Sequence, residues 1–284
     1  MQWWPTAATA FTFSAGSGAA GLAFDGGNMW VAGTGSNIVS EIRVSDGSTI
    51  GAFPTGNLPV AVAFDGANVW VVNNSDNTVT KLRASDGASL GTFAVGSGPR
   101  AIAFDGTNLW VVNSNSNNVT ELRPSDGTTL GTFAVGNAPL GIAFDGANMW
   151  VTNSGDNSVS LLRVSDGAQL ATGTVGAIPS GIAFDGTNMW VTNSGSSTLS
   201  ELKLSTTLVP PTFKITVVST ISTAGHPTAI AFDGSNVCVV STSVVARYRV
   251  SDGANVGSVS LGGFAVAFDG INMWVTHGNS ITKL

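Results

Sequence analysis

The sequence predicts an all-β protein, a seven-bladed β-propeller of four-stranded antiparallel blades, and three observations support this prediction. The phrase Ala-Phe-Asp-Gly occurs seven times in 284 residues, with its Phe at positions 24, 64, 104, 144, 184, 232 and 268. Turn signals divide each repeat, most often 40 residues long, into four short segments. No window shows the hydrophobic period of a helix. Four antiparallel strands in about 40 residues are typical of a propeller blade.

The repeat around Phe144 shows how each blade divides into strands. We expect four strands, named a to d in chain order, over residues 140–144, 149–153, 158–164 and 169–175. In strand a, Ile142 and Phe144 share one face, as expected for a half-buried strand. Asp145-Gly146 begins a tight hairpin turn, because Gly readily supplies the positive φ that such turns need. The polar segments 154–157 and 165–167 form the next two turns.

The two ends of the chain predict how the ring closes. Phe53 of strand d lies eleven residues before Phe64, and Phe13 lies eleven residues before Phe24. The chain therefore begins with a strand d that has no blade of its own, and it ends inside strand c of the seventh repeat. We expect residues 6–16 to complete blade seven beside residues 279–284, a 3+1 closure that leaves no open edge between blades. Residues 1–284 then form a single propeller domain.

Composition excludes several classes of protein. With 17 acidic and 11 basic residues the formal net charge is −6, so the chain lacks the basic surface that nucleic-acid binding requires. A single cysteine cannot form an internal disulfide, and one Cys with two His cannot build a structural zinc site. No apolar run approaches the roughly 18 residues of a membrane span, and Met1–Pro5 do not begin a signal peptide. We expect a monomer without a cofactor.

Several positions recur in every blade, and we interpret them as structural. One strand-b position carries Trp30, Trp70, Trp110, Trp150, Trp190 and Trp274, with Cys238 in blade six. We expect each Trp to fill the wedge between two blades rather than to stack on sugars, and Cys238 to leave its wedge underfilled. A ring of aspartates lies in the a–b turns: Asp25, Asp65, Asp105, Asp145, Asp185, Asp233 and Asp269. These favour turn formation over metal binding, because an Asp carboxylate accepts local backbone N–H groups.

A basic position recurs on strand c. It comprises Arg43, Arg83, Arg123, Arg163, Lys203, Arg249 and Lys283. The c–d turns that follow carry aspartates in most blades, so we expect these basic side chains to pair with turn aspartates or to stay in water. The a–b and c–d turns share one end of the ring, which we name the bottom face; the b–c and d–a loops form the top face.

The strand-b sequence Trp-Val-Thr-Asn at 150–153 and 190–193, with Pro before strand a and Gly after strand d, resembles the YVTN-type bacterial propeller repeat. Trp stands where that family has Tyr. The layout is also similar to NHL-type repeats and to the streptogramin B lyase propeller. The resemblance covers essentially the whole chain and implies a bacterial protein that is extracellular or attached to the cell surface.

The lyase resemblance implies a top-face His that transfers protons beside a magnesium ion held by carboxylates. His277 is the one histidine at a matching kind of position. The strand-b ends that would need Glu carry Asn, Ser or Gly instead. Because magnesium prefers several converging oxygen ligands, usually including carboxylates, we predict no metal site and assign no catalytic residue.

Departures from the repeat are the better guide to a ligand site. The top face of blades six and seven has a shortened b–c loop, a Gly262-Gly263 segment in place of a Pro, and both histidines. We predict ligand-binding residues on this face at His226, His277, Arg100, Ser241 and Asn193, with Arg100 able to anchor a carboxylate across the opening. Loop loss by drift after duplication is the alternative explanation.

The sequence favours a non-enzymatic binding or scaffold module that engages a protein or glycan through its top face. The alternative is a streptogramin-lyase-like enzyme that acts at the top of the central channel. Propellers host unrelated activities, so the fold alone does not decide between the two.

Overall fold

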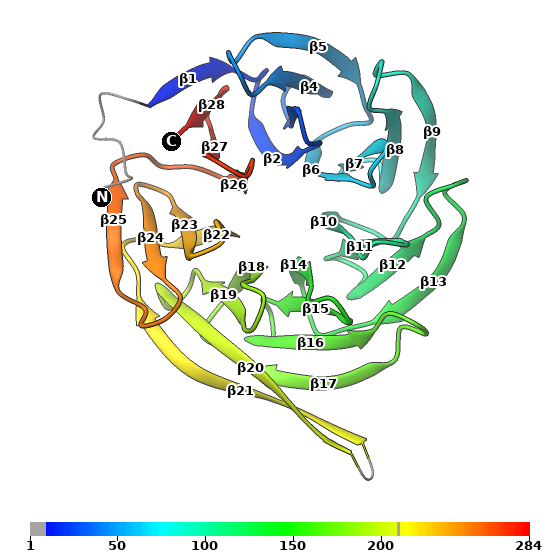
Figure 1. Cartoon of the computed structure of the whole chain (residues 1–284). Coiled ribbons are helices and arrows are strands. Elements are labelled where there is room, and N and C mark those ends of the chain that lie inside the picture. Colours follow the sequence, from blue (N-terminus) through cyan, green and yellow to red (C-terminus); the bar gives the residue numbers. More distant parts are fainter. Residues whose placement is uncertain (1–9, 209–210) are drawn as a thin grey trace.

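A computed structural model describes residues 10–208 and 211–284 and confirms the predicted fold. These residues form seven four-stranded antiparallel sheets arranged as blades around a central opening (Figure 1). Within every blade, the strand nearest the opening is strand a and the outermost is strand d. Among the described residues, none forms a helix of the length and apolar character that crossing a membrane requires.

The strands of the first six blades follow chain order. Blades one to three contain β2 (Ala19–Phe24), β3 (Asn28–Gly33), β4 (Ile38–Arg43) and β5 (Thr49–Pro54); β6 (Pro59–Phe64), β7 (Asn68–Asn73), β8 (Thr78–Arg83) and β9 (Ser89–Ala94); and β10 (Pro99–Phe104), β11 (Leu109–Asn113), β12 (Asn118–Leu122) and β13 (Thr129–Ala134). Blades four to six contain β14 (Pro139–Phe144), β15 (Asn148–Asn153), β16 (Ser158–Arg163) and β17 (Gln169–Thr174); β18 (Pro179–Phe184), β19 (Met189–Asn193), β20 (Thr198–Leu208) and β21 (Pro211–Ser222); and β22 (Pro227–Phe232), β23 (Asn236–Ser241), β24 (Val245–Arg249) and β25 (Asn255–Val259).

Blade seven joins the two ends of the described chain, as the sequence predicts. Its strands are β26 (Ala265–Phe268), β27 (Met273–His277), β28 (Ser280–Lys283) and the N-terminal β1 (Phe11–Ser14), in the order β1-β28-β27-β26. The register runs from Phe11 opposite Lys283 to Ser14 opposite Ser280. Residues 6–9 of the predicted closing segment lie outside the described residues. The ladder stops before residue 16 because Gly16 adopts a positive φ of 86°.

The six strand-b tryptophans fill the wedges between blades. All six are at most 2% exposed, and Trp30, for example, packs against Val62, Val69 and Leu82 of blade two. Each indole N–H donates to the carboxylate of the a–b turn in its own blade, at 2.7–2.8 Å. A strand-d Phe packs on the indole in four blades, as Phe53 does on Trp30. The recurring Trp and Asp positions are therefore one structural unit.

Blade six replaces this unit rather than leaving it incomplete. Cys238 is fully buried, but its cross-strand neighbour Arg247 donates a hydrogen bond to the Asp233 carboxylate, which the indole N–H reaches in other blades. The expectation of an underfilled wedge did not allow for this compensation from strand c. Burial raises the pKa of the Cys238 thiol to about 12.

One of the residues that the sequence analysis assigned to the basic position on strand c, Lys283, occupies a different position in the sheet. Arg43, Arg83, Arg123, Arg163 and Arg249 each pair with the Asp three residues later, at 2.8–3.4 Å. Lys283 instead lies opposite Trp274, as Lys81 lies opposite Trp70. The ammonium of each lysine lies over that indole. The b–c turn of blade seven contains only Gly278 and Asn279, two residues fewer than in blade two. Because of this shortening, counting along the repeat assigned Lys283 to the wrong position on strand c.

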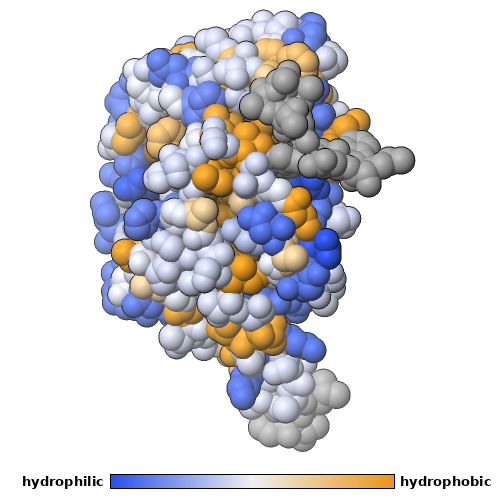
Figure 2. All heavy atoms as spheres, turned by 90° about the vertical axis from the view of Figure 1, so that its left-hand side faces the viewer, coloured by the Kyte–Doolittle hydropathy of each residue, from blue (hydrophilic) through white to orange (hydrophobic). Residues whose placement is uncertain are grey.

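The insertion in blade five lengthens β20 and β21 into a two-stranded ribbon that runs along β17 of blade four (Figure 1). The ribbon also projects beyond the body of the molecule at its lower end (Figure 2). Ile215 and Phe213 of β21 pack into the core around Trp150. Gly173 stands where four other blades have their strand-d Phe, and a Cβ there would lie 2.5 Å from a methyl carbon of Ile215. Blade four has therefore exchanged its own aromatic cover for the neighbouring ribbon.

The closure of blade seven leads to a first prediction. Deleting residues 1–16 removes β1, exposes the edge of β28 and uncovers Trp274. Because loss of a packed Phe alone costs about 3–5 kcal/mol, we expect the deletion to lower the free energy of unfolding by at least roughly 3 kcal/mol. Urea denaturation with a tryptophan fluorescence readout measures this change.

Two variants within β1 provide the control. Phe13 packs on Trp274 with ring centroids 5.9 Å apart, whereas Phe11 is 62% exposed. Phe13→Ala should therefore destabilise the protein clearly more than Phe11→Ala. Equal effects of the two variants, or an unchanged stability after deletion, would contradict closure by β1.

The replacement of the Trp–Asp unit in blade six leads to a second prediction. Cys238→Trp alone should destabilise the protein by about 1–3 kcal/mol, because Arg247 already occupies part of the wedge. Adding Arg247→Glu recreates the Trp–Glu pair of Trp30 and Glu41, so it should recover stability with a coupling energy of roughly 0.5–3 kcal/mol. Arg249→Glu on the same strand is the control and should show no coupling. If urea denaturation shows that the effects of Cys238→Trp and Arg247→Glu on the free energy of unfolding are additive, the compensation is refuted.

Candidate functional site

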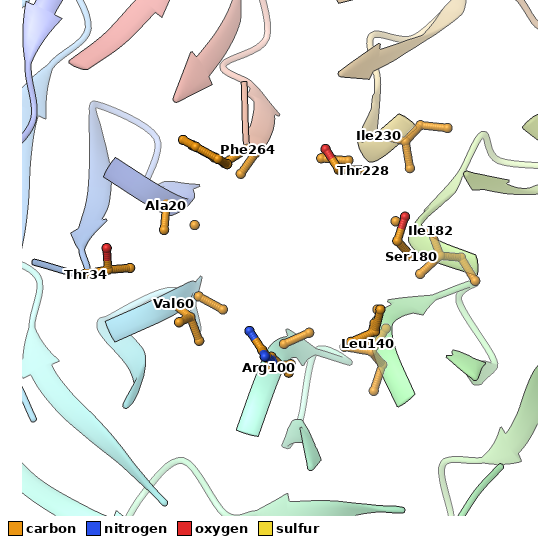
Figure 3. Close-up of a pocket in the computed structure, with 18 of the residues that line it drawn as sticks. Ala20, Thr34, Val60, Arg100, Leu140, Ser180, Ile182, Thr228, Ile230 and Phe264 are labelled. Carbon is orange, nitrogen blue, oxygen red and sulfur yellow. The ribbon is translucent and has the colours of Figure 1, made fainter. Parts of the chain in front are cut away.

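The top face contains a cavity of about 620 Å³ at the centre of the ring. Its walls come mainly from the innermost strands β2, β6, β10, β14, β18, β22 and β26, together with Phe264 just before β26. One residue from each blade lines its mouth, four positions before the Phe of the repeated Ala-Phe-Asp-Gly phrase. This mouth ring consists of Ala20, Val60, Arg100, Leu140, Ser180, Thr228 and Phe264 (Figure 3).

The next position on each strand is always Gly or Ala, since the innermost strands approach one another closely. A Cβ on Gly141 would lie 2.2 Å from the backbone oxygen of Ser180, and one on Gly21 would lie 2.5 Å from that of Val60. One position further from the mouth, Ile142, Ile182 and Ile230 contribute apolar side chains to the wall. The size of the cavity is therefore set by small residues at the blade contacts and by the mouth ring above them.

The cavity is apolar apart from one charge. Among the described residues that line it, Arg100 is the one charged side chain, and Figure 3 shows it extending into the opening. The hydroxyls of the wall are occupied within the protein. Thr34 donates to the carbonyl of Gly18 at 2.9 Å, and Thr228 donates to that of Val240 at 3.3 Å. Ser180 contacts the hydroxyl of Thr192 at 3.0 Å.

Of the five ligand-binding residues predicted from sequence, the structure brings Arg100 to the cavity and places the other four elsewhere. Ser241 is 2% exposed, and its hydroxyl donates to the carbonyl of Val244. Asn193 is fully buried and donates to the hydroxyls of Thr198 and Ser200. These two side chains hold strands b and c together.

The two histidines also lie apart from the described lining of the cavity. His226 is exposed, and its Nδ1 lies 2.8 Å from the carbonyl oxygen of Ser194. His277 is half-buried, and its Nε2 lies 2.6 Å from the hydroxyl of Thr282. Burial lowers the pKa of His277. Both side chains thus contact neighbouring segments of the top face.

Sequence reasoning missed Ala20 and Phe264. Both occupy the strand position of Arg100, which is the one member of the mouth ring among the predicted ligand-binding residues. Counting four positions back from each repeated Phe would have found both. Phe264 is 63% exposed at the rim, so a large apolar surface faces solvent there.

The magnesium site that the lyase resemblance implies does not fit the residues present. Within residues 10–208 and 211–284, no group of three or more His, Cys, Asp or Glu side chains is placed to hold a metal ion. The strand-b ends carry no carboxylates. The side chains of Asn153 and Asn193 donate hydrogen bonds to strand c.

A second cavity, of about 550 Å³, lies on the bottom face between blades three and four and contains Glu121. Burial raises the pKa of Glu121, a hydrogen bond from Asn108 lowers it, and the Asp105 charge raises it. Glu41 and Glu201 have the same kind of Asn partner in blades one and five, and their pKa values are also raised. Recurrence in three blades indicates a structural role.

His277 gives a third prediction. Because burial disfavours the charged imidazolium, its pKa should lie below the ordinary value of 6.5. The unfolded chain then binds the proton more readily, so this contribution to stability is present above pH 6.5 and is lost as the pH falls towards the folded pKa. NMR titration of the imidazole measures the pKa, and a midpoint at or above 6.5 would contradict the burial. His277→Asn should reduce the loss of stability on acidification.

Comparison with known proteins shows the fold. No protein-family model matches the sequence, and no curated protein matches it. Among solved structures, hydrazine synthase of Kuenenia stuttgartiensis is similar with a TM-score of 0.80 at 15% identity, over 94% of this chain and 95% of that chain. A streptogramin B lyase structure has a TM-score of 0.79 at 18% identity, over 96% of each chain. U3-55K has a TM-score of 0.82 at 14% identity, over 99% of each chain. The chain is thus a seven-bladed β-propeller, in agreement with its YVTN-type and NHL-like resemblance.

Proposed function

We propose that the protein is a non-enzymatic binding module whose ligand enters the top-face cavity. One observation carries this proposal. The mouth ring contains seven different residue types in seven blades, whereas the position after it is always Gly or Ala and the repeated phrase itself is constant. Propellers usually bind at this end of the channel, and pockets of about 300–1,000 Å³ suit small molecules. Variation at every member of the mouth ring of such a cavity supports binding of an asymmetric ligand.

The chemistry of the cavity favours binding over catalysis. A guanidinium offers hydrogen-bond donors and no acceptor, so Arg100 does not supply a general base. The hydroxyls of Ser180 and Thr228 are engaged with neighbouring protein groups. Within the described lining, Phe264 is the one aromatic side chain, which favours a small ligand with an apolar body over a glycan that needs stacking platforms. The likeness to streptogramin B lyase is a likeness of fold.

A thermal-shift screen of small molecules against two Trp variants tests the proposal. Leu140→Trp fills the mouth of the cavity, and Leu130→Trp makes the same change on the outer strand β13, where the side chain is 42% exposed. A ligand at about 100 times its Kd stabilises the native state by about 2.7 kcal/mol. That corresponds to a rise in Tm of several degrees for a domain of this size. The rise should disappear in Leu140→Trp and persist in Leu130→Trp.

The screen can also refute the proposal. If every stabilising compound acts equally on the wild type and on Leu140→Trp, the cavity is not the binding site. Glycans are included in the screen, since preferential stabilisation by a glycan would favour a surface site on the rim over the cavity.

A further inference from the structure

The arginines of this protein have aspartate partners with one exception. Six of the seven arginines form ion pairs with an Asp: Arg43, Arg83, Arg123, Arg163, Arg247 and Arg249. Arg100 forms no ion pair with any described residue. The chain has 17 acidic residues, so acidic partners are abundant in the sequence. An exposed arginine at the mouth of the cavity therefore departs from the pairing found throughout the rest of the protein.

The surroundings of Arg100 exclude the usual partners of a surface arginine. In the mouth ring its neighbours are Val60 and Leu140, and across the opening lie Thr228 and Phe264 (Figure 3). The wall beneath consists of small residues and isoleucines. Arg100 is exposed in this structure, so we expect water to solvate its charge until a ligand covers the mouth. A ligand that covers it must then replace that water with an acceptor of its own.

We propose that the ligand is an amphipathic monoanion, with a carboxylate held by Arg100 and an apolar body against the cavity wall. This inference rests on the proposed function and names the chemical class of its ligand. The planar guanidinium matches a carboxylate through two parallel hydrogen bonds. One cation balances one negative charge. A polyanion would leave further charges unbalanced in an apolar cavity of a protein whose net charge is −6.

Phe264 and the three isoleucines of the wall indicate where the apolar body of the ligand lies. Arg100 stands at the mouth, while Ile142, Ile182 and Ile230 line the wall further from it. With the carboxylate at the mouth, the apolar body extends along these side chains and beneath Phe264. Phe264 is 63% exposed in this structure, so a ligand that packs on it removes apolar surface from water.

Calorimetric titration with three probes of equal chain length tests the inference. The probes are octanoate, octan-1-ol and octylammonium, which share their apolar body and differ in the charge of the head group. A charge-assisted hydrogen-bonded pair changes affinity by roughly tenfold or more. We expect octanoate to bind at least about tenfold more tightly than octan-1-ol, and octylammonium to bind most weakly.

Two matched variants assign the preference to Arg100. Arg100→Leu introduces the residue type found at position 140. It should lower the affinity for octanoate about tenfold and leave the affinity for octan-1-ol unchanged. Arg83→Leu makes the same change in net charge on the bottom face and should leave all three affinities unchanged. If Arg83→Leu weakens octanoate as much as Arg100→Leu does, the preference reflects the overall charge, and the inference is wrong.

The remaining outcomes separate this inference from the proposed function. If octanoate and octan-1-ol bind equally and both are lost in Leu140→Trp, the cavity binds apolar ligands, but the anion class is wrong. If octylammonium binds as tightly as octanoate, the anion class is also wrong. If no probe binds, the monoanion inference is refuted, and the thermal-shift screen alone decides the proposed function. If the probes bind but Leu140→Trp leaves their binding unchanged, the cavity is not the binding site, and both the inference and the proposed function are refuted.

Discussion

The ring depends on a hydrogen bond from an indole N–H to a turn carboxylate, which occurs in six of the seven blades. A buried Trp needs a partner for its N–H, and the Asp at the a–b turn already accepts two backbone N–H groups from the turn itself, as Asp25 does from Gly27 and Asn28. The same carboxylate thus fixes the turn and orients the side chain that fills the wedge. Burial raises the pKa of Asp65, but the hydrogen bonds from Trp70, Asn68 and the turn backbone outweigh burial and lower it.

The periodic part of the structure could be predicted from sequence because each blade repeats the same solution. Seven copies of one phrase predict the number of blades, and the equal spacings from Phe13 to Phe24 and from Phe53 to Phe64 predict the closure. The prediction failed where a local change in length altered the register. Lys283 was counted with the arginines because the two-residue turn of blade seven was not recognised, and pairing with Trp274 became visible only in the sheet. The compensation by Arg247 and Ile215 could not be predicted from sequence, because predicting it requires knowing which side chains face each other in the folded protein.

The candidate site could be predicted only in part, for a related reason. Arg100 lies on an innermost strand, and all seven such strands converge on one cavity, so variation there is variation within one site. The histidines attracted attention as rare residues near shortened loops. Their side chains, however, contact Ser194 and Thr282. The fold directs Arg100 towards a space shared by all seven blades, whereas ligand binding by the two histidines stays a prediction.

The ribbon of blade five makes the stability of the ring uneven. In a repeat protein each unit contacts mainly its neighbours, so equivalent junctions contribute similarly to cooperativity. Here β21 packs along β17 and completes the core around Trp150, whereas the N-terminal strand β1 pairs with β28 of blade seven through four residue pairs. Local opening follows the distribution of such contacts. We therefore expect blades four and five to open as one cooperative unit and the pairing of β1 with β28 to open first.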